Sequence, residues 1–163
     1  MIFRIRIILD VKEDVFRDLE IEASATLEEF HNTITQSFGF LGNEMASFYR
    51  TNDDWEQGEE LPLMELDPSQ PSMQNEVLEK LFTADNHKLL YIYDFLSMWT
   101  FFVELMEVAE PVAGIAYPTL IYAEGEVPEE APEKLFEGQQ DDGEFLEDEE
   151  DGTAEDYKDE DFY

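Results

Sequence analysis

The chain has 163 residues and a formal net charge of −33, from 42 acidic and 9 basic residues. A surface this negative repels nucleic acid phosphates and anionic lipid headgroups, so we expect no direct nucleic acid binding and no membrane binding. The absence of cysteine excludes disulfides, thiolate metal sites and cysteine nucleophiles.

Two predicted strands open the chain. Residues 2–9 alternate apolar side chains with Arg4 and Arg6, and residues 15–21 alternate again after a short polar turn. A period of two is typical of strands that bury one face. The two segments therefore predict an antiparallel strand pair ahead of the first helix.

The first helix has clear signals at both ends. Thr26 is followed three residues later by Glu29, which is the spacing of a capping box. Gly39 is the predicted stop. The apolar residues that share one helical face are Leu27, Phe30, Ile34 and Phe38.

The middle of the chain carries weaker signals. Residues 45–50 are interpreted as a short strand. Residues 61–66 are interpreted as a strand at the edge of the sheet, where Pro62 is tolerated because it has no backbone N–H to donate. Residues 77–82 predict a short second helix.

The longest apolar segment, residues 89–108, predicts a β-hairpin rather than a membrane helix. Asp94, Glu104 and Glu107 interrupt it, and a charge at the centre of a bilayer costs at least ~2.5 kcal/mol. Its first half alternates like a strand, and its second half is rich in aromatic and β-branched residues. We expect the turn near residues 96–98.

The chain changes character after this hairpin. Residues 117–122 predict a last short strand. From about Asp141 the chain is mostly Asp and Glu, and such a segment buries too little apolar surface to offset its ordering entropy. We therefore predict an α+β domain over residues 1–135 and a disordered acidic tail over residues 136–163.

Four groups of residues occur in an order that a known family shares. They are Leu27, His31, Phe38 and Gly39 in the helix; Tyr93, Asp94, Phe95 and Trp99 in the hairpin; Tyr117 and Pro118; and Pro128, Glu129 and Glu130. This order resembles the Ri-plasmid third-open-reading-frame-like proteins, a prokaryotic family sometimes labelled as transposon passengers. The resemblance covers roughly residues 3–132. It implies a sheet with one main helix packed across it, similar to a β-grasp arrangement, and it implies no particular activity.

The chain departs from the family pattern at three places. Leu96 and Ser97 stand where the family has Gly and Asp in the hairpin turn. Phe101 stands where the family has a histidine, and Ala131 and Pro132 lie where paired glycines are expected. If a polar site in the family used the turn Asp and that His, this chain has lost both.

Asp94, Trp99, Glu129 and Glu130 are the candidate binding residues. Asp94 either accepts backbone N–H groups of the hairpin turn and so sets its register, or presents its carboxylate to a cation in a pocket with Glu129 and Glu130. We favour the first role. Trp99 is either a core residue, which we favour, or a platform on which a ligand stacks.

Catalytic and metal-binding patterns are missing from the sequence. His31 is predicted to be a structural histidine that hydrogen-bonds a neighbour, and the two histidines have no zinc-site spacing. Ser97 lacks the context of a catalytic serine, and no glycine-rich phosphate loop occurs. We therefore predict no catalytic residue, no metal ligand and no cofactor, and an enzyme is the less favoured class.

Our prediction is a cytoplasmic, non-catalytic interaction module whose acidic surface and tail engage a basic protein surface. Arg4 and Arg6 interrupt the first apolar run and no cleavage site follows, so a secretory signal is not expected. The alternative is a small ligand- or metal-binding protein or enzyme with a pocket near the four candidate residues. The sequence makes no prediction of the oligomeric state.

Overall fold

The computed structural model describes residues 1–132, of which residues 1–131 form one compact unit. The predicted tail, residues 136–163, lies outside the described residues. The elements are β1 Ile2–Leu9, β2 Phe16–Glu22, α1 Leu27–Phe38, β3 Ala46–Arg50, β4 Glu60–Pro62, the 3-10 turn η1 Met73–Asn75, α2 Leu78–Leu81, β5 Lys88–Tyr93, β6 Trp99–Ala109 and β7 Thr119–Glu124.

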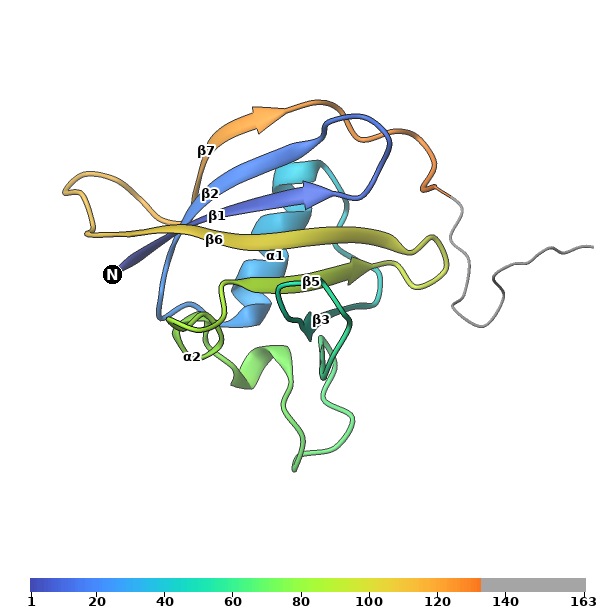
Figure 1. Cartoon of the computed structure of the whole chain (residues 1–163), viewed down its shortest axis with the longest axis horizontal. Coiled ribbons are helices and arrows are strands. Elements are labelled where there is room, and N and C mark those ends of the chain that lie inside the picture. Colours follow the sequence, from blue (N-terminus) through green and yellow to red (C-terminus); the bar gives the residue numbers. More distant parts are fainter. Residues whose placement is uncertain (133–163) are drawn as a thin grey trace, which may run out of the picture. The chain divides into compact units, whose positions relative to one another are not determined.

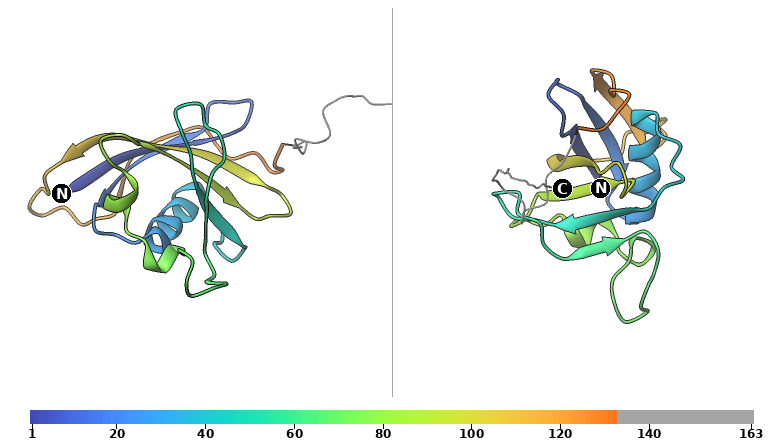
Figure 2. Two further views of the ribbon diagram at one scale, coloured as in Figure 1. Left: turned by 60° about the horizontal axis from the view of Figure 1, so that its bottom comes forward. Right: turned by 90° about the vertical axis from the view of Figure 1, so that its right-hand side faces the viewer.

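The strands of the described chain form one seven-stranded sheet in the order β4-β3-β5-β6-β1-β2-β7. Every neighbouring pair in it is antiparallel. Helix α1 crosses one face of this sheet (Figure 1; Figure 2). The predicted α+β class, the mostly antiparallel sheet and the single main helix are confirmed.

Two strands differ from their predicted bounds because of proline. The predicted strand 61–66 is only three residues long as β4, since Pro62 supplies no N–H and a turn around Asp67 follows. The last strand, β7, begins at Thr119 rather than at Tyr117, directly after Pro118.

Helix α1 starts and stops where its local signals predict. The Thr26 hydroxyl accepts the N–H of Glu29 at 3.1 Å, and the Glu29 carboxylate accepts the N–H of Thr26 at 2.9 Å, which completes the capping box. Gly39 ends the helix in the left-handed region, with φ of 84°. The end signals of this helix are therefore read correctly from short-range sequence alone.

We expect Thr26→Ala to lower the free energy of unfolding by about 1 kcal/mol, because it leaves the N–H of Glu29 without its acceptor. Chemical denaturation measures the loss. Thr33→Ala is the matched control: its hydroxyl donates to the carbonyl of Glu29 inside the helix, and such a bond adds little to a helix that Ala favours. Equal losses in the two variants would contradict the capping role.

The core lies between α1 and the sheet. The Phe30 ring of α1 stacks on the Phe48 ring of β3 with centroids 5.4 Å apart. On the opposite face of the sheet the loop between β3 and β4 packs through Trp55, whose ring centroid lies 5.0 Å from that of Phe102 on β6. Lys88 lies over the Trp55 ring at 4.7 Å. The hairpin predicted over residues 89–108 is thus central in the sheet, and it is covered on both faces around Phe102.

Four loop segments meet at one end of the sheet, which we call the hairpin end (Figure 1). They are residues 10–15, 39–45, 94–98 and 125–132. Backbone bonds tie them together: the N–H of Asp94 donates to the carbonyl of Met45 at 2.8 Å, and that of Asp10 to Thr100 at 2.8 Å. A Cβ at Gly125 would lie 2.2 Å from the carbonyl oxygen of Asp14, so only glycine allows this approach.

Candidate functional site

Asp94 organises the β5–β6 turn. Its backbone is in the left-handed region with φ of 66°, and its Oδ1 accepts the N–H groups of Leu96 at 3.1 Å and Ser97 at 3.4 Å. Its carbonyl also accepts the N–H of Met98. These contacts agree with the favoured interpretation, in which Asp94 sets the turn.

Trp99 belongs to an aromatic cluster rather than to an open surface. It is 7% exposed, and its ring centroid lies 5.2 Å from that of Phe40 in the α1–β3 loop. Phe40 in turn contacts Tyr93 and Phe101. The Tyr93 hydroxyl accepts the N–H of Gly42 at 3.0 Å, which fixes the loop over the cluster. Trp99 therefore anchors the loop that follows α1.

Glu129 and Glu130 are exposed in the segment after β7. Val127 and Ala131 on either side of them pack against the core, so the segment lies along the hairpin end. Within residues 1–132 no hydrogen bond or ion pair joins either glutamate to Asp94, and no group of three His, Asp or Glu side chains is placed to hold a metal. The shared pocket stays a prediction.

Apolar side chains protrude at this same end. Leu96 in the β5–β6 turn is 96% exposed and Leu41 in the α1–β3 loop is 88% exposed, while Met45 and Phe95 are each exposed to 40%. We call these four residues the apolar tip. Exposed apolar side chains that gather on one surface mark contact sites for other macromolecules. Phe95 is exposed because β5 ends at Tyr93, so the turn directs the chain away from the sheet before this residue.

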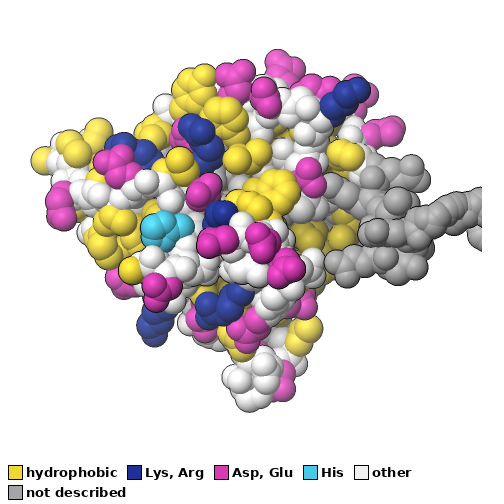
Figure 3. Space-filling model, in the orientation of Figure 1, with side chains coloured by type: hydrophobic (Ala, Val, Ile, Leu, Met, Phe, Trp, Pro, Cys, Tyr) yellow, Lys and Arg dark blue, Asp and Glu magenta, His cyan; other side chains and the backbone are white. Residues whose placement is uncertain are grey.

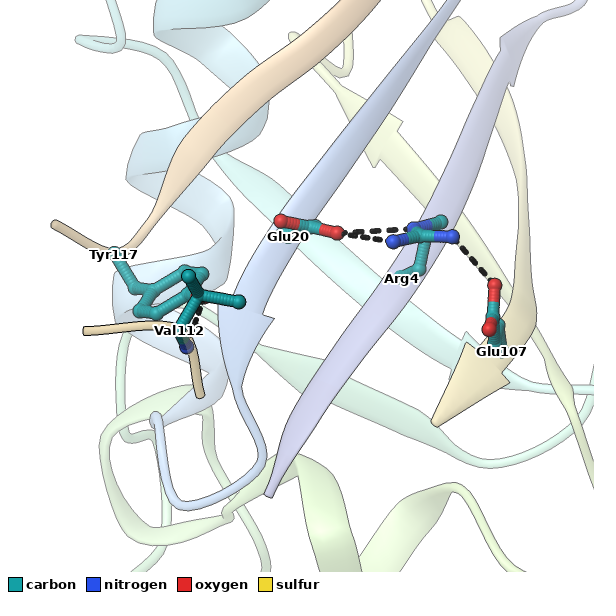
Figure 4. A network of polar contacts seen from close by, with 5 residues as sticks. All are labelled: Arg4, Glu20, Glu107, Val112 and Tyr117. Atoms are coloured by element: carbon teal, nitrogen blue, oxygen red, sulfur yellow. Dashed lines mark hydrogen bonds and ion pairs between the residues drawn. The ribbon is translucent and has the colours of Figure 1, made fainter. Parts of the chain in front are cut away.

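Positive charge on the described surface is largely neutralised by the protein itself. Arg4 lies between Glu20 and Glu107 (Figure 4). Arg6 forms a two-pronged pair with Asp18. The hydrogen bond to Glu20 raises the pKa of Arg4. Asp and Glu side chains are spread over the face in Figure 3, with few basic side chains among them. The described surface is therefore predominantly acidic (Figure 3).

A cavity of about 280 Å³ lies between α1 and the chain just before β7. Carboxylate, amide and hydroxyl groups from α1 form one wall, the end of β2 forms the floor, and the Tyr117–Pro118 pair closes the other side. We call it the α1 pocket; its lining residues are Ile21, Glu22, Ala25, Glu29, Asn32, Thr33, Gln36, Tyr117 and Pro118. The hydroxyl of Tyr117 accepts the N–H of Val112 at 3.1 Å (Figure 4).

His31 forms a buried pair with Tyr91. Its Nδ1 lies 2.5 Å from the Tyr91 hydroxyl, and its side chain is 2% exposed. Burial lowers the pKa of His31 to about 4 and raises that of Tyr91, so both groups are neutral at pH 7. A neutral, enclosed pair holds α1 on β5 and has no access to a substrate. His31 thus has the structural hydrogen bond predicted for it.

The α1 pocket was not among the candidate sites of the sequence. Glu29, Asn32, Thr33 and Gln36 follow a helical spacing, but a polar helix face is ordinarily solvated and predicts no site. The Tyr-Pro pair was noticed only through the family resemblance. The missing information was long-range, since nothing local indicates that residues 117–118 return to lie beside α1.

The described residues define an α+β protein in which one capped helix crosses an antiparallel sheet, with a neutral His–Tyr pair between them and carboxylates outside. The chain belongs to the family of plasmid pRiA4b ORF-3-like proteins, whose family model matches residues 1–161. The resemblance found in the sequence is thereby confirmed.

Among solved structures, the chain is similar to MM3350 from Methanosarcina mazei Go1, a protein of unknown function. The TM-score is 0.69 and the identity 21%, over 78% of this chain and 72% of that chain. At this identity the similarity shows the fold alone. No curated protein matches the chain. Within residues 1–132 no helix combines the length and the apolar character needed to cross a membrane.

Proposed function

We propose that the chain is a non-catalytic interaction module that binds a basic protein through its acidic surface and the apolar tip. The observation that carries the proposal is that most of the described basic side chains are already engaged by other groups of the same chain. Of the seven Lys and Arg residues within residues 1–132, Arg4, Arg6 and Arg50 are paired with carboxylates, Arg17 is buried, and Lys88 lies over the Trp55 ring. Lys12 and Lys80 are exposed. The remaining carboxylates attract a cationic surface over long range.

The apolar tip supplies the binding affinity that surface charge alone does not. Surface charges raise association rates and select the partner, whereas apolar anchors at the centre of a contact contribute most of its affinity. Leu41 and Leu96 stand clear of the sheet, and Glu44 and Asp94 flank them in sequence. An apolar centre with an acidic rim is complementary to a partner with apolar anchors among lysines and arginines.

We expect Leu96→Asp to weaken binding of the partner at least about tenfold, because it places a charge in the apolar centre of the contact. The full-length chain is immobilised, proteins of a cell lysate are captured, and each is eluted with increasing salt. A captured protein supports the proposal if it is basic and if its affinity for the chain falls as the salt concentration rises. It should also elute at lower salt from Leu96→Asp than from the unchanged chain.

Leu66→Asp is the matched control, since Leu66 is 82% exposed in a loop outside the hairpin end. Equal effects of the two substitutions, or capture that neither salt nor Leu96→Asp alters, would rule out the apolar tip. A chain that ends at residue 135 lacks the acidic tail and keeps every described residue, so it measures the contribution of the tail.

Three finer expectations remain part of this proposal. They are a cytoplasmic location, a β-grasp-like relationship of the sheet and helix, and a disordered tail that adds to the attraction of the basic partner. The association of the family with mobile elements is compatible with a partner that is itself basic, as proteins that bind nucleic acids commonly are.

A further inference from the structure

The α1 pocket lies away from the hairpin end, on the side of α1 that faces the start of β7. Its apolar lining is mostly covered: Ile21 and Ala25 are buried, and Pro118 forms part of the rim. Its volume of about 280 Å³ is near the lower limit of the ~300–1,000 Å³ found for ligand pockets. This size suits one side chain or a very small molecule.

Both charged groups of the α1 pocket are negative. Glu22 and Glu29 contribute carboxylates, and the lining contains no Lys, Arg or His. Only Oε1 of Glu29 is engaged, with the N–H of Thr26, so its second oxygen is available. Asn32 and Gln36 add amide oxygens from the next turns of the helix.

These groups select against most ligand classes. An anion would meet two carboxylates with no compensating cation, which is unfavourable at short range. A neutral apolar ligand would bury the carboxylates without a partner. A cation carried on an aliphatic stem satisfies both parts of the lining, because the stem covers the apolar floor and the charged end reaches the carboxylates.

We propose that the α1 pocket receives the alkyl cation at the end of a lysine or arginine side chain of the basic partner. This inference rests on the proposed function and names a second contact of that complex. The methylene groups lie on Ile21 and Pro118, and the ammonium or guanidinium group donates to Glu22, to the free oxygen of Glu29 and to the amide oxygen of Gln36. The occupant is a side chain of another protein.

The probe for this site is n-butylammonium chloride, with n-butylguanidinium as a second arm and 1-butanol as the neutral isostere. Each is titrated into the full-length chain at constant ionic strength, and the side-chain amides of Asn32 and Gln36 are followed by NMR. We expect saturable shifts with both cations and binding of butanol at least about tenfold weaker.

Glu22→Gln should weaken butylammonium binding about tenfold, because it removes one carboxylate and keeps the shape. Glu28→Gln is the control, since Glu28 is exposed on the first turn of α1 and does not line the pocket. Shifts that fail to saturate by about 100 mM, equal binding of butanol, or equal weakening by the two substitutions would overturn the proposal.

The same spectra distinguish a side chain of a basic partner from a second copy of the chain as the occupant of the α1 pocket. Shifts at these amides that grow with protein concentration before any amine is added would assign the pocket to a second copy of the chain and overturn the partner. If the unchanged chain binds no amine but still captures a basic protein through Leu96, the inference about the α1 pocket is wrong and the proposed function stands. Amine binding without such capture would defeat the proposed function and the assignment of the pocket to its partner, and would leave in place the selectivity of the α1 pocket for alkyl cations.

Discussion

Replacement of Arg17 by methionine is expected to lower the free energy of unfolding by about 3 kcal/mol. The side chain is 8% exposed and donates to three backbone carbonyls, those of Phe16, Ser37 and Glu124, each at 2.9 Å. Burial lowers the pKa of its guanidinium, which nevertheless stays protonated at neutral pH. Methionine fills similar space but leaves buried acceptors without donors. Urea denaturation of both proteins measures the difference.

The position of Arg17 explains why the loss should be large. Ser37 lies in the last turn of α1, where carbonyl groups have no partner within the helix and carry partial negative charge, and no basic residue occurs in that turn. Arg17 supplies the charge from β2 and also binds the carbonyl of Glu124 at the end of β7. One side chain therefore joins the helix to two strands.

Two comparisons isolate this role. Arg17→Lys keeps the charge but lacks the planar guanidinium group with its several N–H donors. It should therefore recover less than half of the unfolding free energy that Arg17→Met loses. Arg6→Met removes an arginine of the outer face that pairs with Asp18 in partial contact with water, and exposed pairs of that kind contribute about 0–1 kcal/mol. A cost for Arg17→Met no greater than that for Arg6→Met would refute the bridging role.

Short-range signals account for what the sequence predicted correctly. The capping box at Thr26, the stop at Gly39 and the alternation of residues 2–9 each depend on neighbours a few residues away. Such signals determine the type of an element without reference to the rest of the fold. The hairpin of β5 and β6 was predicted for the same reason, because its two strands are joined by a short turn.

Long-range contacts account for what the sequence left open. Pairing of β7 with β2 joins residues about a hundred positions apart, and no local pattern encodes it. Arg17 looked like one more member of an alternating strand, since its acceptors come from α1 and β7. The pocket beside α1 was missed for the same reason, whereas Asp94 and Trp99 were noticed because they are neighbours in a motif.

A second large effect is expected in acid. His31 has a pKa of about 4 in the folded protein and about 6.5 when unfolded, because burial disfavours its charged form. Between these values the unfolded chain binds a proton that the folded chain does not, so the contribution of His31 to stability falls as the pH falls from 6.5 to 4. The loss reaches about 3 kcal/mol by pH 4.

The many carboxylates act in the opposite direction, because protonation relieves their mutual repulsion, so the stability of the unchanged protein alone does not reveal His31. His31→Gln removes the titrating group, and its hydrogen-bond partner Tyr91, whose pKa is raised by burial, stays uncharged throughout this range. The difference in unfolding free energy between the unchanged protein and His31→Gln should therefore decrease by about 3 kcal/mol from pH 7.5 to pH 4. Parallel pH profiles would mean that the imidazole is protonated equally easily in both states, and the enclosed neutral pair between α1 and β5 would then be wrong.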